Sequence, residues 1–122
     1  MTSNYLTWAE ILYTNPGMGN CGGIHPRKDK ECGVLLCSAE NKLYEDIETI
    51  SIYKYQAETF KNGKMGRNKS VIENVKKFKK TGIARKYKIY KKIKPNQYLD
   101  MGSWWLANYI VTEKLFFILI KQ

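Results

Sequence analysis

The clearest periodic pattern in the sequence is the spacing of apolar residues between positions 70 and 81. Apolar side chains recur there at helical intervals, at Val71, Val75 and Phe78. Ser70 and Glu73 have the spacing of a capping box, Asn68 is a rival cap, and Gly82 follows the pattern. Lys76, Lys77, Lys79 and Lys80 occupy four of the other positions. The pattern therefore predicts an amphipathic helix whose outer face is basic.

A shorter helix is predicted near the amino end of the chain. Thr7 and Glu10 have capping-box spacing. The apolar side of this helix consists of Trp8, Ile11 and Leu12. An Asn-Pro-Gly sequence at 15–17 ends it, and a glycine-rich loop follows.

Strand patterns occupy much of the rest of the chain. The apolar run GVLLCS at 33–38 is typical of a buried strand, and KLYED at 42–46 is predicted to continue it after a turn. Apolar and polar residues alternate at 50–55, which places Tyr53 and Tyr55 on the same face.

Three more strands are predicted in the second half of the chain. A basic strand covers 85–93, and the segments 104–113 and 115–121 form a closing pair around a turn at Glu113-Lys114. Two short helices among five or six strands favour a small, twisted and closed barrel.

The length and composition indicate one globular domain, residues 1–122. A hydrophobic fraction of 43% and an aromatic fraction of 13% argue against disorder. The first residues lack the basic start and apolar core of a signal peptide, and the longest apolar run, at 115–120, is too short to span a membrane. We expect a soluble, cytoplasmic protein with no membrane partner.

The formal net charge of +10 is unevenly distributed. Residues 61–94 contain fourteen Lys or Arg and one acid, Glu73, whereas residues 1–60 contain five bases and eight acids. A basic block on an acidic or neutral body indicates a surface for a polyanion. The alternative is a solvated lysine-rich face without a partner.

The three cysteines and the single histidine form a weak candidate for a zinc site. The candidate ligands are Cys21, His25, Cys32 and Cys37. They include enough ligand types for a tetrahedral zinc but lack the tight paired spacing of most such sites. We therefore predict free thiols, no metal and no cofactor, with Cys37 as a small buried hydrophobe.

Signals for catalysis are few. A single histidine excludes the multi-histidine nuclease motifs, and no strand carries an aspartate followed by a glutamate and a lysine two positions apart. Glu45 and Asp46 are adjacent, so on a strand they face opposite sides and cannot form a metal pair unless the backbone bulges. We predict that the chain is not an enzyme and that any nuclease activity belongs to another domain or subunit.

Signals for binding are stronger between residues 44 and 74. Aromatic side chains can stack on a base, and a carboxylate can accept a hydrogen bond from the exocyclic amine of cytosine. The candidate base pocket consists of Tyr44, Asp46, Tyr55 and Tyr53. A base taken out of the stack would lie between two tyrosine rings. The alternative is that these tyrosines fill the core of the barrel, with hydroxyl groups at its surface.

The order of several motifs resembles that of a known family. The motifs are GGI-HP at 22–26, GVLLCS at 33–38, YED at 44–46, YKYQ at 53–56, RNKSVIEN at 67–74, a basic strand, and WW-x-x-x-YIV at 104–111. Together they resemble the SRA (YDG) domain of the PUA-like superfamily, in the short prokaryotic form of modification-dependent restriction endonucleases. The resemblance covers roughly residues 20 to 120 and rests on order and spacing.

The resemblance implies a fold and a set of roles. The fold would be α+β and mainly β, a small twisted PUA-like or SRA-like barrel of five to seven strands with two short helices. Such a domain binds duplex DNA and flips a modified cytosine into a pocket. Tyr44 and Tyr55 would sandwich the base, Asp46 would bond its Watson–Crick edge, and Arg67 with Asn68 would contact DNA.

The remaining predictions concern the DNA backbone and the departures from the family pattern. Candidate backbone contacts are Lys64, Arg67, Asn68, Lys69, Lys76, Arg85 and Lys86. The family usually has Thr-Gly after its second pocket aromatic, where this chain has Gln56-Ala57-Glu58. It also has Tyr-Asp-Gly near the last strands, where this chain has Gly102-Ser103-Trp104-Trp105.

The function predicted from the sequence is recognition of modified cytosine in duplex DNA, as part of a restriction system with a separate or fused nuclease partner. One alternative is a PUA-like module that stacks unpaired RNA bases on Tyr53, Tyr55, Trp104 or Trp105. Another is a zinc-stabilised domain whose basic face docks an acidic protein.

Overall fold

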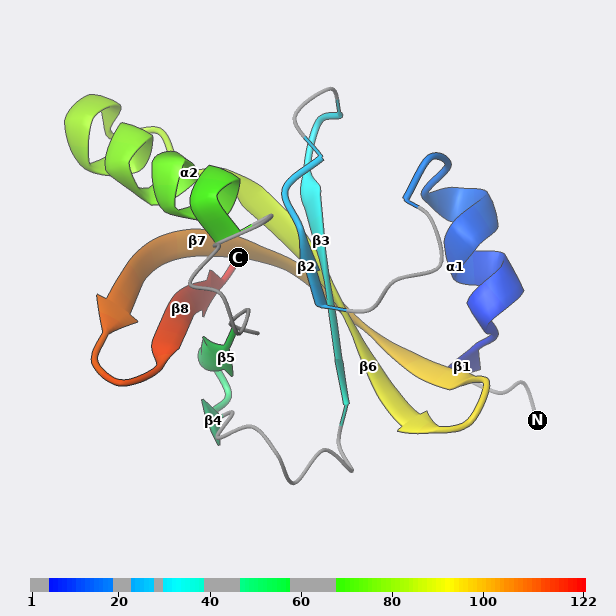
Figure 1. Cartoon of the computed structure of the whole chain (residues 1–122). Coiled ribbons are helices and arrows are strands. Elements are labelled where there is room, and N and C mark those ends of the chain that lie inside the picture. The colour runs from blue at the N-terminus through cyan, green and yellow to red at the C-terminus, as the bar shows by residue number, and fades with distance from the viewer. Residues whose placement is uncertain (1–4, 19–22, 28–29, 39–46, 58–67) are drawn as a thin grey trace.

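The computed structural model describes residues 5–18, 23–27, 30–38, 47–57 and 68–122, which form two helices and eight strands (Figure 1). The helices are α1 (Trp8–Thr14) and α2 (Asn68–Thr81). The strands are β1 (Tyr5–Leu6), β2 (Gly23–His25), β3 (Gly33–Ser38), β4 (Ile47–Glu48), β5 (Ile52–Gln56), β6 (Lys86–Lys94), β7 (Gln97–Val111) and β8 (Leu115–Lys121). The predicted class, mainly β with two helices, is confirmed. None of the helices in these ranges is long and apolar enough to cross a membrane.

The strands form one mixed sheet in the order β2-β3-β6-β7-β8-β5-β4, and β1 pairs with β7. Only β3 and β6 run parallel among these pairs. Strand β7 is 15 residues long and strongly curved, and it pairs with β6 along its first part and with β8 along its second (Figure 1). Register shifts in both pairings favour such bending.

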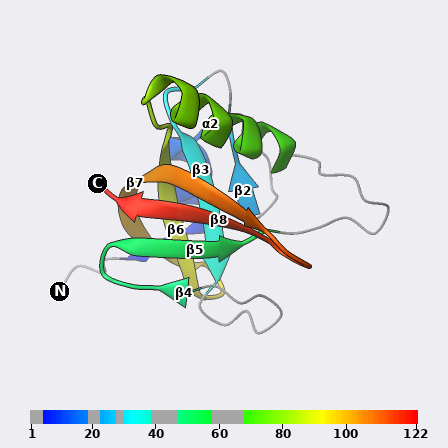
Figure 2. The same ribbon diagram turned by 90° about the vertical axis from the view of Figure 1, so that its left-hand side faces the viewer.

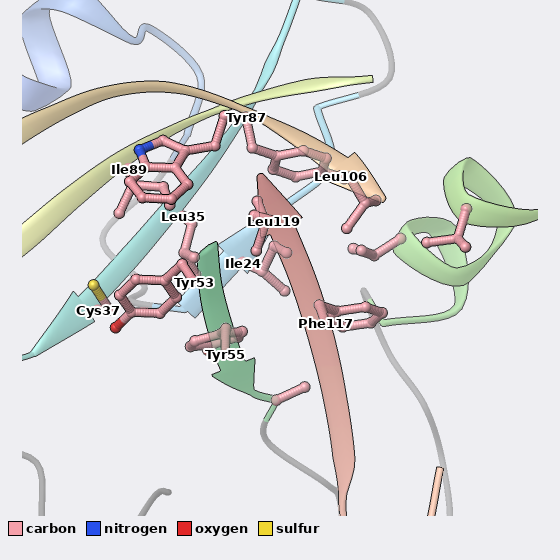
Figure 3. Packing of buried hydrophobic residues seen from close by; sticks show 14 of the residues in the cluster. Ile24, Leu35, Cys37, Tyr53, Tyr55, Tyr87, Ile89, Leu106, Phe117 and Leu119 are labelled. Carbon is pink, nitrogen blue, oxygen red and sulfur yellow. The ribbon is translucent and has the colours of Figure 1, made fainter. Parts of the chain in front are cut away.

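The sheet curls until non-neighbouring strands meet. Lys91 Nζ of β6 lies 2.7 Å from Glu48 Oε1 of β4, although the two strands are not adjacent in the sheet. The curled sheet surrounds a core to which six of the strands and α2 contribute side chains, and Figure 3 shows the tyrosines of β5 among them. The interior is therefore filled with side chains, as in other small barrels.

A second, smaller core lies on the outer face of β3 and β6. Val34 and Leu36 of β3 and Tyr90 of β6 pack there against Ile11 of α1. Because successive strand residues point to opposite sides, β3 serves both cores, with Leu35 in the larger one. This explains why its sequence is a continuous apolar run.

Several local predictions are confirmed. The strand at 33–38 has the predicted bounds, and the capping box of Thr7 and Glu10 is present at α1. The predicted cap of the second helix is wrong, because α2 already includes Asn68 and Ser70 therefore lies inside the helix. The predicted strand at 42–46 lies outside the described residues.

Candidate nucleic-acid interface

Helix α2 presents a basic face to solvent. Its inner side is fixed by Val71 and Val75, which are completely buried in the main core, with Ile72 packed beside them. The spacing predicted Val71 and Val75 on this side; Phe78, the third predicted member of the stripe, is half-buried and does not belong to the core cluster, whereas Ile72 packs against it. Its exposed lysines are Lys69, Lys76, Lys77, Lys79 and Lys80.

A hydrogen bond between side chains ties α2 to strand β6. The Tyr87 hydroxyl donates to Asn74 Oδ1 at 2.8 Å. The ring of Tyr87 lies where Gly33 leaves space, since a Cβ on Gly33 would come within 2.3 Å of Tyr87 Cε2. Burial raises the pKa of Tyr87 above its usual value, and the nearby Arg85 lowers it only in part. The phenol therefore stays neutral and keeps its proton for Asn74.

The charge of the α2 lysines is available for an anionic ligand. Glu73 is the only acidic residue of the helix. Within the described part of the chain, none of the α2 lysines forms an ion pair. Lys79 is partly engaged, because its ammonium group lies 5.8 Å from the centre of the Tyr109 ring.

Two lysines of β6, unlike those of α2, form ion pairs among the described residues. Lys88 Nζ lies 3.0 Å from Asp100 Oδ2, and Lys91 pairs with Glu48. Partial burial by itself would lower the pKa of Lys88. The hydrogen bond to Asp100 and the nearby charges outweigh this effect, so the pKa lies above the usual lysine value. The Lys86 ammonium group lies 5.7 Å from the Trp105 ring centre, which still leaves its charge available.

Arg85 has a structural use that its sequence context does not reveal. Its guanidinium group donates hydrogen bonds to backbone carbonyl groups of the loop between β2 and β3. The acceptors are the carbonyl oxygens of Pro26, Arg27, Lys30 and Glu31, at 2.7 to 3.4 Å. Asn68 is also an internal residue, with 6% of its surface exposed. We therefore do not count these two side chains among the phosphate contacts proposed below.

The candidate base pocket is only partly described. Tyr44 and Asp46, together with the backbone candidates Lys64 and Arg67, lie outside the described residues. Tyr53 and Tyr55 point into the main core and are 2% and 8% exposed (Figure 3). Tyr53 meets Trp104 edge to face, with ring centres 6.3 Å apart.

The burial of the β5 tyrosines agrees with the alternative that they fill the barrel core. Their role in a base pocket stays a prediction. The burial of these rings argues against the RNA alternative in this conformation, because Tyr53, Tyr55 and Trp104 have no broad exposed ring face on which an unpaired base could stack. Only Trp105 among the four candidates is half-exposed.

The candidate zinc ligands are not gathered in the described residues. These residues contain no group of three or more His, Cys, Asp or Glu side chains that could hold a metal ion, and Cys21 lies outside them. Cys37 belongs to the main core, where its thiol lies 3.7 Å from the Tyr90 carbonyl oxygen. His25 is buried in β2, and Cys32 is a half-exposed free thiol.

Comparison with known proteins identifies the class of fold. No family model matches the sequence, and no curated protein matches it. A solved structure, the crystal structure of the SUVH5 SRA domain in complex with methylated CHH DNA, matches with a TM-score of 0.67. The match covers 98% of this chain and 86% of that chain at 12% sequence identity. The chain therefore has an SRA-like fold.

Proposed function

We propose that this protein binds duplex DNA and recognises a modified cytosine, such as 5-methylcytosine or 5-hydroxymethylcytosine, flipped out of the double helix. The observation that carries the proposal is the SRA-like fold, which the chain shares with a domain solved in complex with methylated DNA. The exposed lysines of α2 support it. In this proposal the barrel recognises the base and α2 holds the backbone.

The proposed backbone contact is the exposed face of α2. Lys76 and Lys80 lie on this face, and Lys69 lies about two helical turns before Lys76. The helix is anchored by buried valines and by the hydrogen bond from Tyr87, so its lysines are held on a fixed support. Lysines that neutralise phosphates release counterions, and they make binding strongly dependent on salt without specifying sequence.

The proposed base contact is the segment before β4 together with β5. Tyr44 and Tyr55 would hold the base, for which the Tyr55 ring, 8% exposed in this structure, has to turn out of the core, and Asp46 would accept a hydrogen bond from the exocyclic amine.

We further propose that the protein is the recognition part of a modification-dependent restriction system. The sequence lacks the histidine and carboxylate patterns of a nuclease, so cleavage is assigned to another domain or subunit. The modified base would then select the site, and the nuclease partner would cut the DNA.

The central test is a binding comparison on duplexes that differ only in one base or linkage. Fluorescence anisotropy would measure the affinity for cytosine, 5-methylcytosine, 5-hydroxymethylcytosine and phosphorothioate versions of one duplex. We expect tighter binding to a cytosine-modified duplex, over a background that weakens with salt. Equal affinity for all four duplexes would contradict the proposal.

Two variants separate base recognition from backbone contact. Asp46→Ala should abolish discrimination between modified and unmodified duplexes and keep the salt dependence, because it removes a base contact and no phosphate contact. Lys76→Ala should weaken binding to every duplex alike and reduce the slope of log affinity against log salt by about 0.9. Identical effects of the two variants would rule out this division. A single-stranded RNA that outcompetes the duplex would instead support the RNA alternative.

A further inference from the structure

The outer face of β5, β8 and the second part of β7 is not covered by either helix. In Figure 2 these strands lie in front, and α2 lies along their upper edge. The inner face of the same strands carries the main core. Neither helix therefore shields this outer face, and its exposed side chains can be identified from the strand register.

One row of side chains crosses three strands on this face. Trp105 of β7 is the Cα partner of Ile120 of β8, and Ile120 is the partner of Ile52 of β5. Directly opposed residues point to the same side of a sheet, so these three side chains form a continuous apolar row. Ile52 and Ile120 are 44% and 43% exposed.

Further apolar residues extend the row. Ile110 of β7, 39% exposed, is the partner of Phe116 of β8, and Ile47 of β4, 54% exposed, is the partner of Lys54 of β5. An antiparallel sheet with one face in water usually alternates apolar residues inside with polar residues outside. On this part of the barrel both faces are largely apolar.

The opposite side of the barrel shows how this protein treats an apolar outer face. Val34, Leu36 and Tyr90 lie on the outer face of β3 and β6, and they are at most 7% exposed because α1 and the residues beside it cover them. The face of β5, β8 and β7 is also apolar and neither helix covers it; Phe116 on this face is 7% exposed, but Ile52, Ile120, Ile110 and Ile47 remain 39% to 54% exposed. Exposed apolar area of this kind marks an interaction surface.

Charge indicates which partner would fit. Lys54 lies with its ammonium group 4.4 Å from the Phe116 ring centre, and Lys86 lies over Trp105, so cations border the apolar row. None of the outward residues of these strands in the described part of the chain is acidic. A second copy would bring the same cations together, and each copy carries a net charge of +10.

We propose that this face, defined by Trp105, Ile120, Ile52, Ile110 and Ile47, binds a second protein that presents apolar side chains bordered by Asp or Glu. The apolar side chains would be buried in the contact, and acidic side chains of the partner would meet Lys86 at its edge and Lys54 between Ile47 and Ile118. The exposed lysines of α2 are a separate group, and Lys86 is the one residue of this face that is also a predicted DNA-backbone contact.

Synthetic peptides provide the test with the full chain. The probes are a peptide of alternating Leu and Glu, a matched peptide of alternating Ser and Glu, and a matched peptide of alternating Leu and Lys. Heteronuclear NMR titration would follow the backbone amides and the indole groups. We expect the Leu-Glu peptide to shift the signals of Ile52, Ile120 and the Trp105 indole, and to bind at least about tenfold tighter than either other peptide.

Surface variants complete the test. The double variant Ile52→Ser/Ile120→Ser should weaken binding of the Leu-Glu peptide by about tenfold or more, because it removes two central apolar contacts. Ile83→Ser is the matched control, since Ile83 is exposed elsewhere, and it should leave binding unchanged. Equal binding of the Ser-Glu peptide, shifts confined to the α2 lysines, or unchanged binding by the double variant would overturn the proposal. The proposal would also be overturned if sedimentation shows that the protein is a homodimer and that the double variant is monomeric, because the face would then bind a second copy of this chain.

Discussion

Helix α2 presents its lysines to solvent, whereas strand β6 pairs two of its lysines with acids on other strands. Lys88 pairs with Asp100 of β7, and Lys91 pairs with Glu48 of β4. No α2 lysine has such a partner among the described residues. The two elements form one basic block in the sequence, yet among the described residues only β6 uses its lysines in ion pairs.

The difference follows from the surroundings of a helix and of a central strand. A surface helix buries one side and leaves the other to water. A strand in a curled sheet lies close to other strands, so Lys88 meets Asp100 on the adjacent β7, and Lys91 meets Glu48 of β4 where the sheet curls. Comparable runs of lysine therefore produce a free basic face on α2 and a set of ion pairs on β6.

The largest effect is expected when the free lysines are removed. The triple variant Lys76→Ala/Lys77→Ala/Lys80→Ala should lower the slope of log DNA affinity against log salt by roughly 2 to 3, because each lost phosphate contact lowers it by about 0.9. At 0.1 M salt this corresponds to a loss of about two to three orders of magnitude in affinity. Anisotropy titrations over a range of salt concentrations would measure it.

A matched triple variant outside α2 tests whether the position of the lysines, and not only their number, governs binding. Lys54→Ala/Lys88→Ala/Lys91→Ala removes the same number of charges, but two of these lysines already have acidic partners and the third lies over a ring. We expect a much smaller change in the salt slope. If both triple variants lose the same slope, net charge rather than the α2 face governs binding.

The second effect concerns the contact between the two elements. Gly33→Ala should destabilise the fold by about 1 to 3 kcal/mol, because the new Cβ would overlap the ring of Tyr87 and the His25 carbonyl oxygen. Displacing Tyr87 should also loosen α2, which the tyrosine hydroxyl holds. Urea unfolding would measure the stability, and hydrogen exchange would show whether α2 loses protection. Unchanged protection in α2 would mean that the helix does not depend on Tyr87.

The third effect isolates the hydrogen bond. Tyr87→Phe should cost about 1 kcal/mol near neutral pH, because Asn74 loses its donor. Asn74→Ala should have a similar cost, and the double variant should cost less than the sum of the two. Additive costs would show that the pair does not act as a unit.

The raised pKa of Tyr87 should make the free energy of unfolding depend on pH in the alkaline range. Burial raises the pKa of Tyr87 in the folded protein, whereas the unfolded chain has the ordinary tyrosine value of about 10. Above that pH the unfolded chain releases a proton that the folded chain retains, so the free energy of unfolding falls as pH rises. The stability difference between the wild type and Tyr87→Phe should therefore shrink above about pH 10. A constant difference would contradict the assigned burial.

The smallest effect is expected for an ion pair of β6. Lys88→Ala should cost at most about 1 kcal/mol at pH 7, since the pair with Asp100 is partly exposed to solvent. The raised pKa of Lys88 means that this contribution is complete below the ordinary lysine pKa and is lost as pH rises through the raised value. Denaturant unfolding in low and high salt would measure it, and a cost insensitive to salt would contradict an ionic origin.

Much of the fold was predictable because local patterns specify local elements. The strand at 33–38 is apolar on both faces because it separates two cores, and the stripe of α2 follows helical spacing. The start of α2 was missed because the spacing of Ser70 and Glu73 also occurs inside a helix. A capping pattern identifies a helix more reliably than its first residue.

The candidate site was less predictable. Lys69 and Lys76 were identified from the basic run and are exposed, as a phosphate contact requires. The use of Arg85 could not be inferred, because its acceptors are carbonyl groups 54 to 59 positions earlier in the chain. No residue type near Arg85 signals such partners.

The apolar side of each element and the location of the basic residues can be predicted from the sequence alone, because both follow from spacing along a single segment. Three features depend on how the chain folds. Helix α1 covers the outer face of β3 and β6, neither helix covers the face of β5, β8 and β7, and the α2 lysines form no ion pair among the described residues. These outcomes depend on contacts between residues far apart in the chain, which no local pattern contains.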